Sequence, residues 1–182
     1  MIIIEGCDIR GKRFVMDYLC KNINNLELLR PKVKAHDDKE RYFNFLMKIF
    51  NIGDYSKVKI MFDGFIFNEL VYGEVLRGES IFTEEQAKII KDNLLLTSPL
   101  VIFCKRDTDA LFNELDETAK LDVVRERIEL VQNKYTELFD NRKCPYKSIR
   151  IEVFDFQNDN IADLESVVKR YISIRTIFTS EK

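Results

Sequence analysis

The sequence contains little of several residue types that mark particular classes of protein. Among its 182 residues there are no tryptophans, one histidine and three prolines. No proline-, glycine- or serine-rich stretch separates one part of the chain from another, so we expect a single domain over residues 1–182. His36 is the only imidazole, and the four cysteines lie at unpaired spacings. We therefore expect no metal site held by the protein alone, and we expect reduced thiols.

A large excess of either charge is also missing. Lysine and arginine number 29, aspartate and glutamate number 31, and the formal net charge is −2. Proteins whose main partner is nucleic acid usually carry a basic surface, so nucleic-acid binding is disfavoured. The longest apolar run, Leu94–Cys104, is broken by polar residues and is shorter than the roughly 20 residues of a membrane span. Since no basic and apolar leader is visible either, we predict a cytoplasmic protein without a membrane segment.

Short apolar runs alternate with longer segments of helical periodicity. The runs that predict strands are Met1–Glu5, Leu26–Leu29, Val58–Phe62, Leu100–Cys104 and Ile149–Phe154. The segments that predict helices are Arg13–Ile23, Asp38–Phe50, Glu84–Leu95, Thr108–Leu115, Leu121–Phe139 and Ile161–Ile174. Apolar strands separated by helices indicate a parallel sheet covered on both faces. We therefore predict an α/β fold with a five-stranded parallel sheet flanked by helices.

Polar or glycine residues come directly after four of these predicted strands. They are Gly6, Asp63, Lys105 and Asp155. In open parallel sheets, ligands bind in a crevice beyond the carboxyl ends of the strands. We therefore expect the loops that carry these residues to meet at one crevice.

The first of these loops has the pattern of a phosphate-binding loop. Gly6 is followed after four residues by Gly11 and Lys12, between an apolar run and an amphipathic segment. In that context backbone N–H groups at a helix N-terminus hold phosphate, which makes Gly6, Gly11, Lys12 and Arg13 candidate phosphate-binding residues. The pattern requires Ser or Thr where Arg13 stands, because that hydroxyl holds the magnesium ion of the nucleotide. Lys12 could otherwise simply cap or solvate the loop.

A second segment, residues 63–78, is more specific. It contains an Asp63-x-Phe65 motif, then Tyr72, then an Arg77-Gly78 pair. With the glycine loop, this segment resembles the thymidylate kinase family of P-loop nucleoside monophosphate kinases, and most of all its small bacteriophage members. The resemblance covers nearly the whole chain. It implies a three-layer P-loop kinase fold, a lid-like region at about 106–128, and pairing of two copies as a homodimer.

The resemblance also implies roles for individual residues. Lys12 and Asp63 would be catalytic, with Lys12 on the donor phosphates and Asp63 beside the magnesium ion. The substrate-binding positions implied by the family are Asp8, Phe65, Tyr72 and Arg77. If nucleotide binding is retained, the cofactor would be Mg-ATP.

The chain departs from the family where catalysis is concentrated. Gly64 stands where the family has an arginine that bridges donor and acceptor phosphates, and Arg13 replaces the magnesium-binding hydroxyl. Loss of such an arginine costs on the order of 10³–10⁵ in rate in related phosphoryl-transfer systems. Arg10 or Arg13 could supply the missing charge, because a guanidinium reaches phosphates that a glycine cannot.

The segment Asp38–Phe50 is apolar over more than one face. Tyr42, Phe45 and Ile49 widen its apolar stripe beyond the width that a surface helix normally buries. Either the helix lies deep between other elements, or these three side chains form an interface with a second copy or a host protein.

These observations favour a degenerate thymidylate-kinase-like protein in which catalysis is lost or strongly reduced. It would act by binding a nucleotide or by capturing a protein partner, as a regulatory or inhibitory phage protein in the host cytoplasm. The alternative is an active ATP-dependent kinase of a deoxynucleoside monophosphate such as dTMP.

Overall fold

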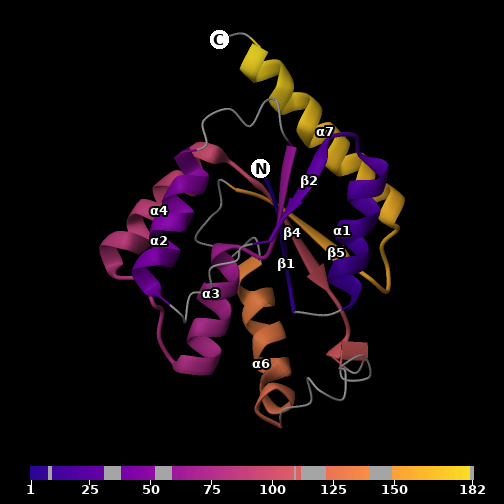
Figure 1. Ribbon diagram of the computed structural model, residues 1–182. Helices are drawn as coiled ribbons and strands as arrows, with labels where there is room; N and C mark the ends of the chain where they lie inside the picture. The colour runs from indigo at the N-terminus through magenta and orange to yellow at the C-terminus, as the bar shows by residue number, and fades with distance from the viewer. Residues whose placement is uncertain are drawn as a thin grey trace.

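Five parallel strands form a sheet in the order β2-β3-β1-β4-β5 (Figure 1). The strands are β1 Ile2–Glu5, β2 Leu26–Leu29, β3 Lys59–Asp63, β4 Leu100–Lys105 and β5 Arg150–Asp155. The computed structural model describes residues 1–7, 10–30, 38–51, 59–108, 110–111, 122–139 and 149–180, without the side chains of residues 10, 122–127 and 176–180. The predicted five-stranded parallel sheet is confirmed.

Helices cover both faces of this sheet and give three layers (Figure 1). The α-helices are α1 Arg10–Asn22, α2 Lys39–Asn51, α3 Ile66–Tyr72, α4 Glu84–Thr97, α6 Asp122–Phe139 and α7 Ile161–Ser180, and a π-helix η1 spans Gly73–Arg77. Side chains alternate across a strand, so Ile2 and Ile4 of β1 pack with α1 and α7, whereas Ile3 packs with the helices of the other face. The sheet is therefore apolar on both sides, as its strands predicted.

The strand register brings the carboxyl ends of the strands to one edge of the sheet. Ile4 of β1 lies beside Asp63 of β3, Glu5 lies beside Phe103 of β4, and Lys105 lies beside Asp155 of β5. Asp63, Lys105 and Asp155 are the last residues of their strands. We expected each of them directly after its strand, so the difference is one residue. The predicted convergence of their loops on one edge is confirmed.

The helices differ from the prediction between β3 and α4. Periodicity did not predict α3 or η1. Four residues of α3 are buried, Ile66, Phe67, Glu69 and Val71, and one of them is a carboxylate. A short helix that buries several faces has no amphipathic stripe to detect. Of the predicted helix 108–115 only residues 108, 110 and 111 are described, and residues 109 and 112–121 of the lid-like region 106–128 lie outside the described part of the chain.

The helix predicted to be apolar on more than one face is α2, and most of its apolar surface is buried within the molecule. Tyr42 stacks on Phe82, and its hydroxyl donates a hydrogen bond of 3.4 Å to the carbonyl oxygen of Phe65. Ile49 lies in the same core, and Phe45 is only partly buried against it. The burial of Tyr42 and Ile49 favours the first of the two alternatives for these side chains, a helix that lies deep between other elements. Of the three, Phe45 retains an accessible surface.

Within the described residues, no helix is both long and apolar enough to cross a membrane.

Candidate functional site

The glycine loop joins β1 to α1 at the carboxyl edge of the sheet. Gly6 has a φ of +137°, and a Cβ atom on it would lie 2.7 Å from the backbone oxygen of Cys104 on β4. A Cβ atom on Gly11 would lie 2.9 Å from the ring of Phe156 and 3.2 Å from the guanidinium of Arg106. Both glycines are therefore at places where the chain passes close to its neighbours. Asp8 and Ile9 lie outside the described residues.

Lys12 projects from the first turn of α1 onto the end of β3. Its Nζ atom lies 3.1 Å from Oδ1 of Asp63, and its side chain is only 3% exposed. The other carboxylate oxygen of Asp63, Oδ2, accepts a hydrogen bond of 3.2 Å from Nε of Arg30. One carboxylate thus holds two cations, one from the first turn of α1 and one from the residue that follows β2. The site brings together two residues that sequence analysis named, Lys12 and Asp63, with one that it did not name, Arg30.

The two ion pairs of Asp63 differ in strength. Arg30 is 58% exposed, and ion pairs of exposed side chains contribute about 0–1 kcal/mol. The Lys12–Asp63 pair lies in a less hydrated position, with Asp63 18% exposed, so it is screened less by solvent. A phosphate arriving at this edge would therefore displace Arg30 from Asp63 more easily than it would displace Lys12.

Beneath this cluster lies a fully buried carboxylate, Glu5. Its Oε1 atom accepts a hydrogen bond of 2.8 Å from the backbone N–H of Phe65, and its Oε2 atom accepts one of 3.4 Å from the hydroxyl of Tyr135. Burial raises the pKa of Glu5 to about 7, against the opposing effects of Lys12 and the two hydrogen bonds. Glu5 thus fixes the backbone that follows Asp63, and its charge responds to pH near neutrality.

The turn after β3 has no room for a side chain at Gly64. Gly64 has a φ of +65°, and a Cβ atom built on it would lie 1.9 Å from Nδ2 of Asn68. The Oδ1 atom of Asn68 accepts a hydrogen bond from the hydroxyl of Tyr135. Asn68 therefore fills the space beside Gly64 and is held there from α6. This packing explains locally how the chain accommodates glycine where the family has arginine.

Helix α6 connects several parts of this edge. Gln132 accepts a hydrogen bond of 3.2 Å from Sγ of Cys7 in the glycine loop and donates one of 3.3 Å to the backbone oxygen of Arg106. Tyr135 reaches Glu5 and Asn68. One buried face of α6 thus holds the ends of β1 and β4 and the first turn of α3 in register.

The predicted acceptor-site residues lie on α3, on η1 and in the turn before them. Arg77 forms an ion pair with Glu69, whose side chain is 7% exposed, and Tyr72 packs edge-on against Tyr135. A Cβ atom on Gly73 would lie 2.7 Å from Nη2 of Arg77, so this glycine lets the guanidinium cross the helix. Phe65 is buried between Phe50 and Phe62. Its backbone N–H donates to Glu5, and its ring is packed in the core.

Two residues at the β4–β5 end of the carboxyl edge form a flat pair. The guanidinium of Arg106, after β4, lies 5.5 Å from the ring centroid of Phe156, after β5. Both adjoin Gly11 at the start of α1. Planar guanidinium and aromatic groups stack readily on other flat rings, including nucleobases.

Two arginines, Arg10 and Arg13, were proposed as substitutes for the missing arginine. Arg13 lies on α1 next to Lys12 and is exposed. Arg10 is the first residue of α1, and its side chain is outside the described part of the chain.

Four residues at this edge were not predicted from the sequence, namely Glu5, Arg30, Tyr135 and Phe156. Two of them carried a usable signal, because Glu5 is the one charged residue in an otherwise apolar first strand and Arg30 follows an apolar run directly. Nothing in the sequence indicated that Tyr135, far along the chain, meets Glu5.

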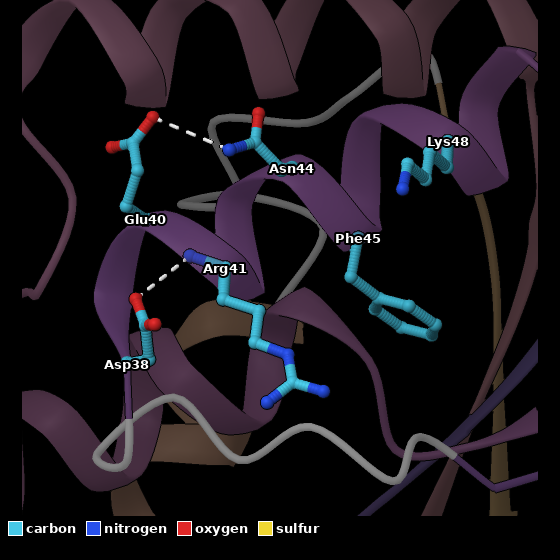
Figure 2. A pocket seen from close by; sticks show the side chains of 6 residues that line it. All are labelled: Asp38, Glu40, Arg41, Asn44, Phe45 and Lys48. Carbon is cyan, nitrogen blue, oxygen red and sulfur yellow. Dashed lines mark hydrogen bonds between the residues drawn. The ribbon is translucent and has the colours of Figure 1, made fainter.

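A separate pocket of about 500 Å³ lies on the outer side of α2 (Figure 2). Its lining residues are Asp38, Glu40, Arg41, Asn44, Phe45 and Lys48. The Oδ1 atom of Asp38 accepts the backbone N–H of Arg41 at 2.9 Å, and Glu40 accepts Nδ2 of Asn44 at 3.4 Å. The first bond caps the helix, so part of the polar lining is used to stabilise α2 itself. The pocket shares no lining residue with the cluster around Asp63.

The overall fold is that of P-loop kinases in solved structures. The YorR protein from Bacillus subtilis, solved in complex with phosphorylated GDP, has a TM-score of 0.72 and 19% sequence identity, over 96% of this chain and 96% of that chain. The thymidylate kinase from Candida albicans has a TM-score of 0.56 and 14% identity, over 96% of this chain and 91% of that chain. No protein-family model matches the sequence, and no curated protein matches it significantly.

Proposed function

We propose that the carboxyl edge of the sheet binds nucleotides in the manner of a nucleoside monophosphate kinase. The observation that carries this proposal is the position of Lys12, which is buried at the start of α1 with its ammonium group against Asp63. A lysine used only to solvate a loop would not be held in this way, because burying a charge is costly without a partner. The adjoining helix N-terminus supplies backbone N–H groups that favour an anion.

The strand order suggests which end of the carboxyl edge would hold which ligand. Arg106 and Phe156 lie at the β4–β5 end, where a nucleobase of the phosphate donor could stack. Tyr72 and Arg77 belong to the segment that follows β3, on the other side of the glycine loop. The donor phosphates would lie on Gly6, Gly11 and Lys12 between these two regions, and the acceptor would lie beside α3 and η1.

Magnesium would be held by fewer protein groups than in an ordinary phosphate-loop enzyme. Mg²⁺ often uses one or two carboxylates together with substrate phosphates and water, and Asp63 is a partly exposed carboxylate in contact with Lys12. Arg13 supplies no oxygen ligand. We therefore propose that Mg-ATP binds with Asp63 as the principal protein group for its metal, and that the metal would neutralise charge on the transferring phosphate.

We further propose that phosphoryl transfer is strongly reduced. Gly64 carries no side chain, and Asn68 fills the space beside it. An arginine acting on the transferring phosphoryl group accelerates such reactions by about 10³–10⁵. The competing proposal is an active deoxynucleoside monophosphate kinase, which the assembly of Lys12, Asp63 and Arg30 favours. Capture of a host protein and homodimer formation have less support, since Tyr42 and Ile49 are buried.

The test is calorimetric titration of the protein with Mg-ATP and, separately, with dTMP, followed by a turnover assay. We expect Mg-ATP to bind the wild-type protein and the Lys21→Met variant, which removes an exposed lysine from the last turn of α1. The Lys12→Met variant should lose Mg-ATP binding. If a folded wild-type sample binds neither ligand, or if Lys12→Met binds Mg-ATP as well as the wild type, nucleotide binding at this loop is refuted. Turnover at ordinary kinase rates would support the competing proposal.

A further inference from the structure

We infer that Arg30 is the residue that binds the phosphate of the acceptor nucleotide. This inference rests on the proposed nucleotide binding and adds a specific anion contact to it. Its basis is the shared carboxylate of Asp63, which holds Lys12 through one oxygen and Arg30 through the other.

The position of Arg30 follows from the sheet. Strand β2 is the edge strand beside β3, and Leu29 pairs with Phe62, so Arg30 comes alongside Asp63 at the carboxyl edge. Lys12 reaches the same carboxylate from the opposite direction, from α1. A phosphoryl group at this point would meet a cation from the donor side and a cation from the side of β2 and β3. The acceptor must come from the latter side, because the glycine loop occupies the former.

The exposure of the two cations also separates their roles. Lys12 is buried at the base of the loop, whereas more than half of the Arg30 side chain is exposed. A ligand can therefore reach Arg30 from solvent without moving the core. Arginine suits this task because its planar fork binds phosphate through two parallel hydrogen bonds.

Position 64 cannot provide the same charge in this fold. Its φ of +65° disfavours any side chain, and the amide of Asn68 occupies the place of a Cβ atom. Arg30 contacts Asp63, the residue just before Gly64, and it directly follows strand β2. The cationic group beside the acceptor phosphate would thus come from β2 instead of from the turn after β3.

The experiment compares the wild type with Arg30→Gln, Arg30→Lys and a charge-matched control, Arg150→Gln. Arg150 is an exposed arginine at the first position of β5, at the opposite edge of the sheet. Each variant is titrated with Mg-ATP, with the deoxynucleoside monophosphate that binds the wild type most tightly among dTMP, dCMP, dAMP and dGMP, and with the nucleoside of that monophosphate. Thermal unfolding of each variant reports whether it is folded.

We expect Arg30→Gln to weaken monophosphate binding by roughly ten- to a hundred-fold, which is the range for a lost hydrogen bond to a charged group. Arg30→Lys should fall between Arg30→Gln and the wild type. Binding of the nucleoside and of Mg-ATP should stay unchanged, and Arg150→Gln should match the wild type throughout.

Three results would overturn the inference. Arg30→Gln could bind the monophosphate as well as the wild type does. It could lose the nucleoside to the same extent, which would indicate a structural role. Arg150→Gln could show the same loss, which would indicate a general effect of net charge. If instead the wild type binds no nucleotide at all, the proposed function itself fails, and this outcome is seen before any variant is compared.

Discussion

Replacing Gly64 by alanine perturbs the turn that separates Asp63 from α3 in two distinct ways. The new residue must keep a φ of +65°, which an L-amino acid disfavours. Its Cβ atom must also displace the amide of Asn68, whose Nδ2 atom would lie 1.9 Å away. Since that amide is the end of a side chain, it can rotate aside, but the hydrogen bond between Tyr135 and Asn68 is then lost.

These two effects give an expected cost for Gly64→Ala. The left-handed conformation costs about 1–2 kcal/mol, and a lost hydrogen bond costs about 1 kcal/mol. We expect Gly64→Ala to lower the free energy of unfolding by about 2–3 kcal/mol in total. Gly78 is a matched control, because its φ is +77° and a Cβ atom on it would meet nothing within 4 Å. Gly78→Ala should therefore show only the conformational cost.

The assay is urea unfolding of the two single variants, of Asn68→Ala and of the double variant Gly64→Ala/Asn68→Ala. Asn68→Ala already lacks the hydrogen bond to Tyr135, so adding Gly64→Ala should cost only the conformational part. The double variant should thus be about 1 kcal/mol more stable than the sum of the single effects predicts. Additive effects, or equal costs for Gly64→Ala and Gly78→Ala, would refute the argument that Asn68 fills the place of a side chain at position 64.

This result bears on any attempt to restore activity. Gly64→Arg together with Arg13→Ser would recreate the family pattern, but the arginine would meet both the positive φ and the amide of Asn68. A smaller residue at position 68 is needed for that test to report on catalysis and not on folding.

Two further predictions concern Glu5, at the buried carboxyl end of β1, and the two glycines of the glycine loop. The pKa of Glu5 is raised from 4.5 to about 7, so the folded protein keeps a proton that the unfolded chain has lost, and stability should fall as pH rises from about 4.5 to about 7. This loss in the free energy of unfolding should be on the order of 3 kcal/mol. Urea unfolding at pH 5 and pH 8 should show a smaller difference for Glu5→Gln than for the wild type. An unchanged pH dependence would contradict the role of Glu5. Gly6→Ala should cost about 2–3 kcal/mol in the same assay because the φ is positive and the backbone oxygen of Cys104 cannot move aside. Gly11→Ala should cost less than about 1 kcal/mol, since its Cβ meets only side chains and alanine favours the helix; equal costs for the two glycines would argue against this account.

Local pattern was sufficient to predict the strands, and the reason is physical. A parallel sheet covered on both faces needs strands that are apolar throughout, so each strand stands out as a short run such as Ile2–Ile4 or Leu100–Cys104. The glycine loop was visible because its two glycines and its lysine recur at a fixed spacing, and at Gly6 the close approach to the backbone of β4 leaves no room for a side chain. The meeting of the loops that carry Lys12 and Asp63 could be predicted, since the ends of parallel strands lie at one edge, but their ion pair was not predicted.

The short α3 and η1 could not be found in this way. They bury residues on several sides, including Glu69, and so lack the periodicity of an amphipathic helix. The reason for the wide apolar surface of α2 could not be decided from the sequence either. Apolar residues on two faces are needed both for a helix covered by its neighbours and for one that meets a partner, and only the positions of α4 and Phe82 distinguish the two for Tyr42.

By itself the sequence determined the α/β architecture, the edge of the sheet at which ligands would bind, and the absence of a hydroxyl after Lys12 and of a side chain at position 64. These properties depend on residue type and on neighbours along the chain. Only the tertiary structure decided that Asn68 fills the space at Gly64, that Tyr135 reaches Glu5, and that Arg30 shares Asp63 with Lys12. Those contacts join residues that are distant in sequence, and their partners are set by how the strands and helices pack.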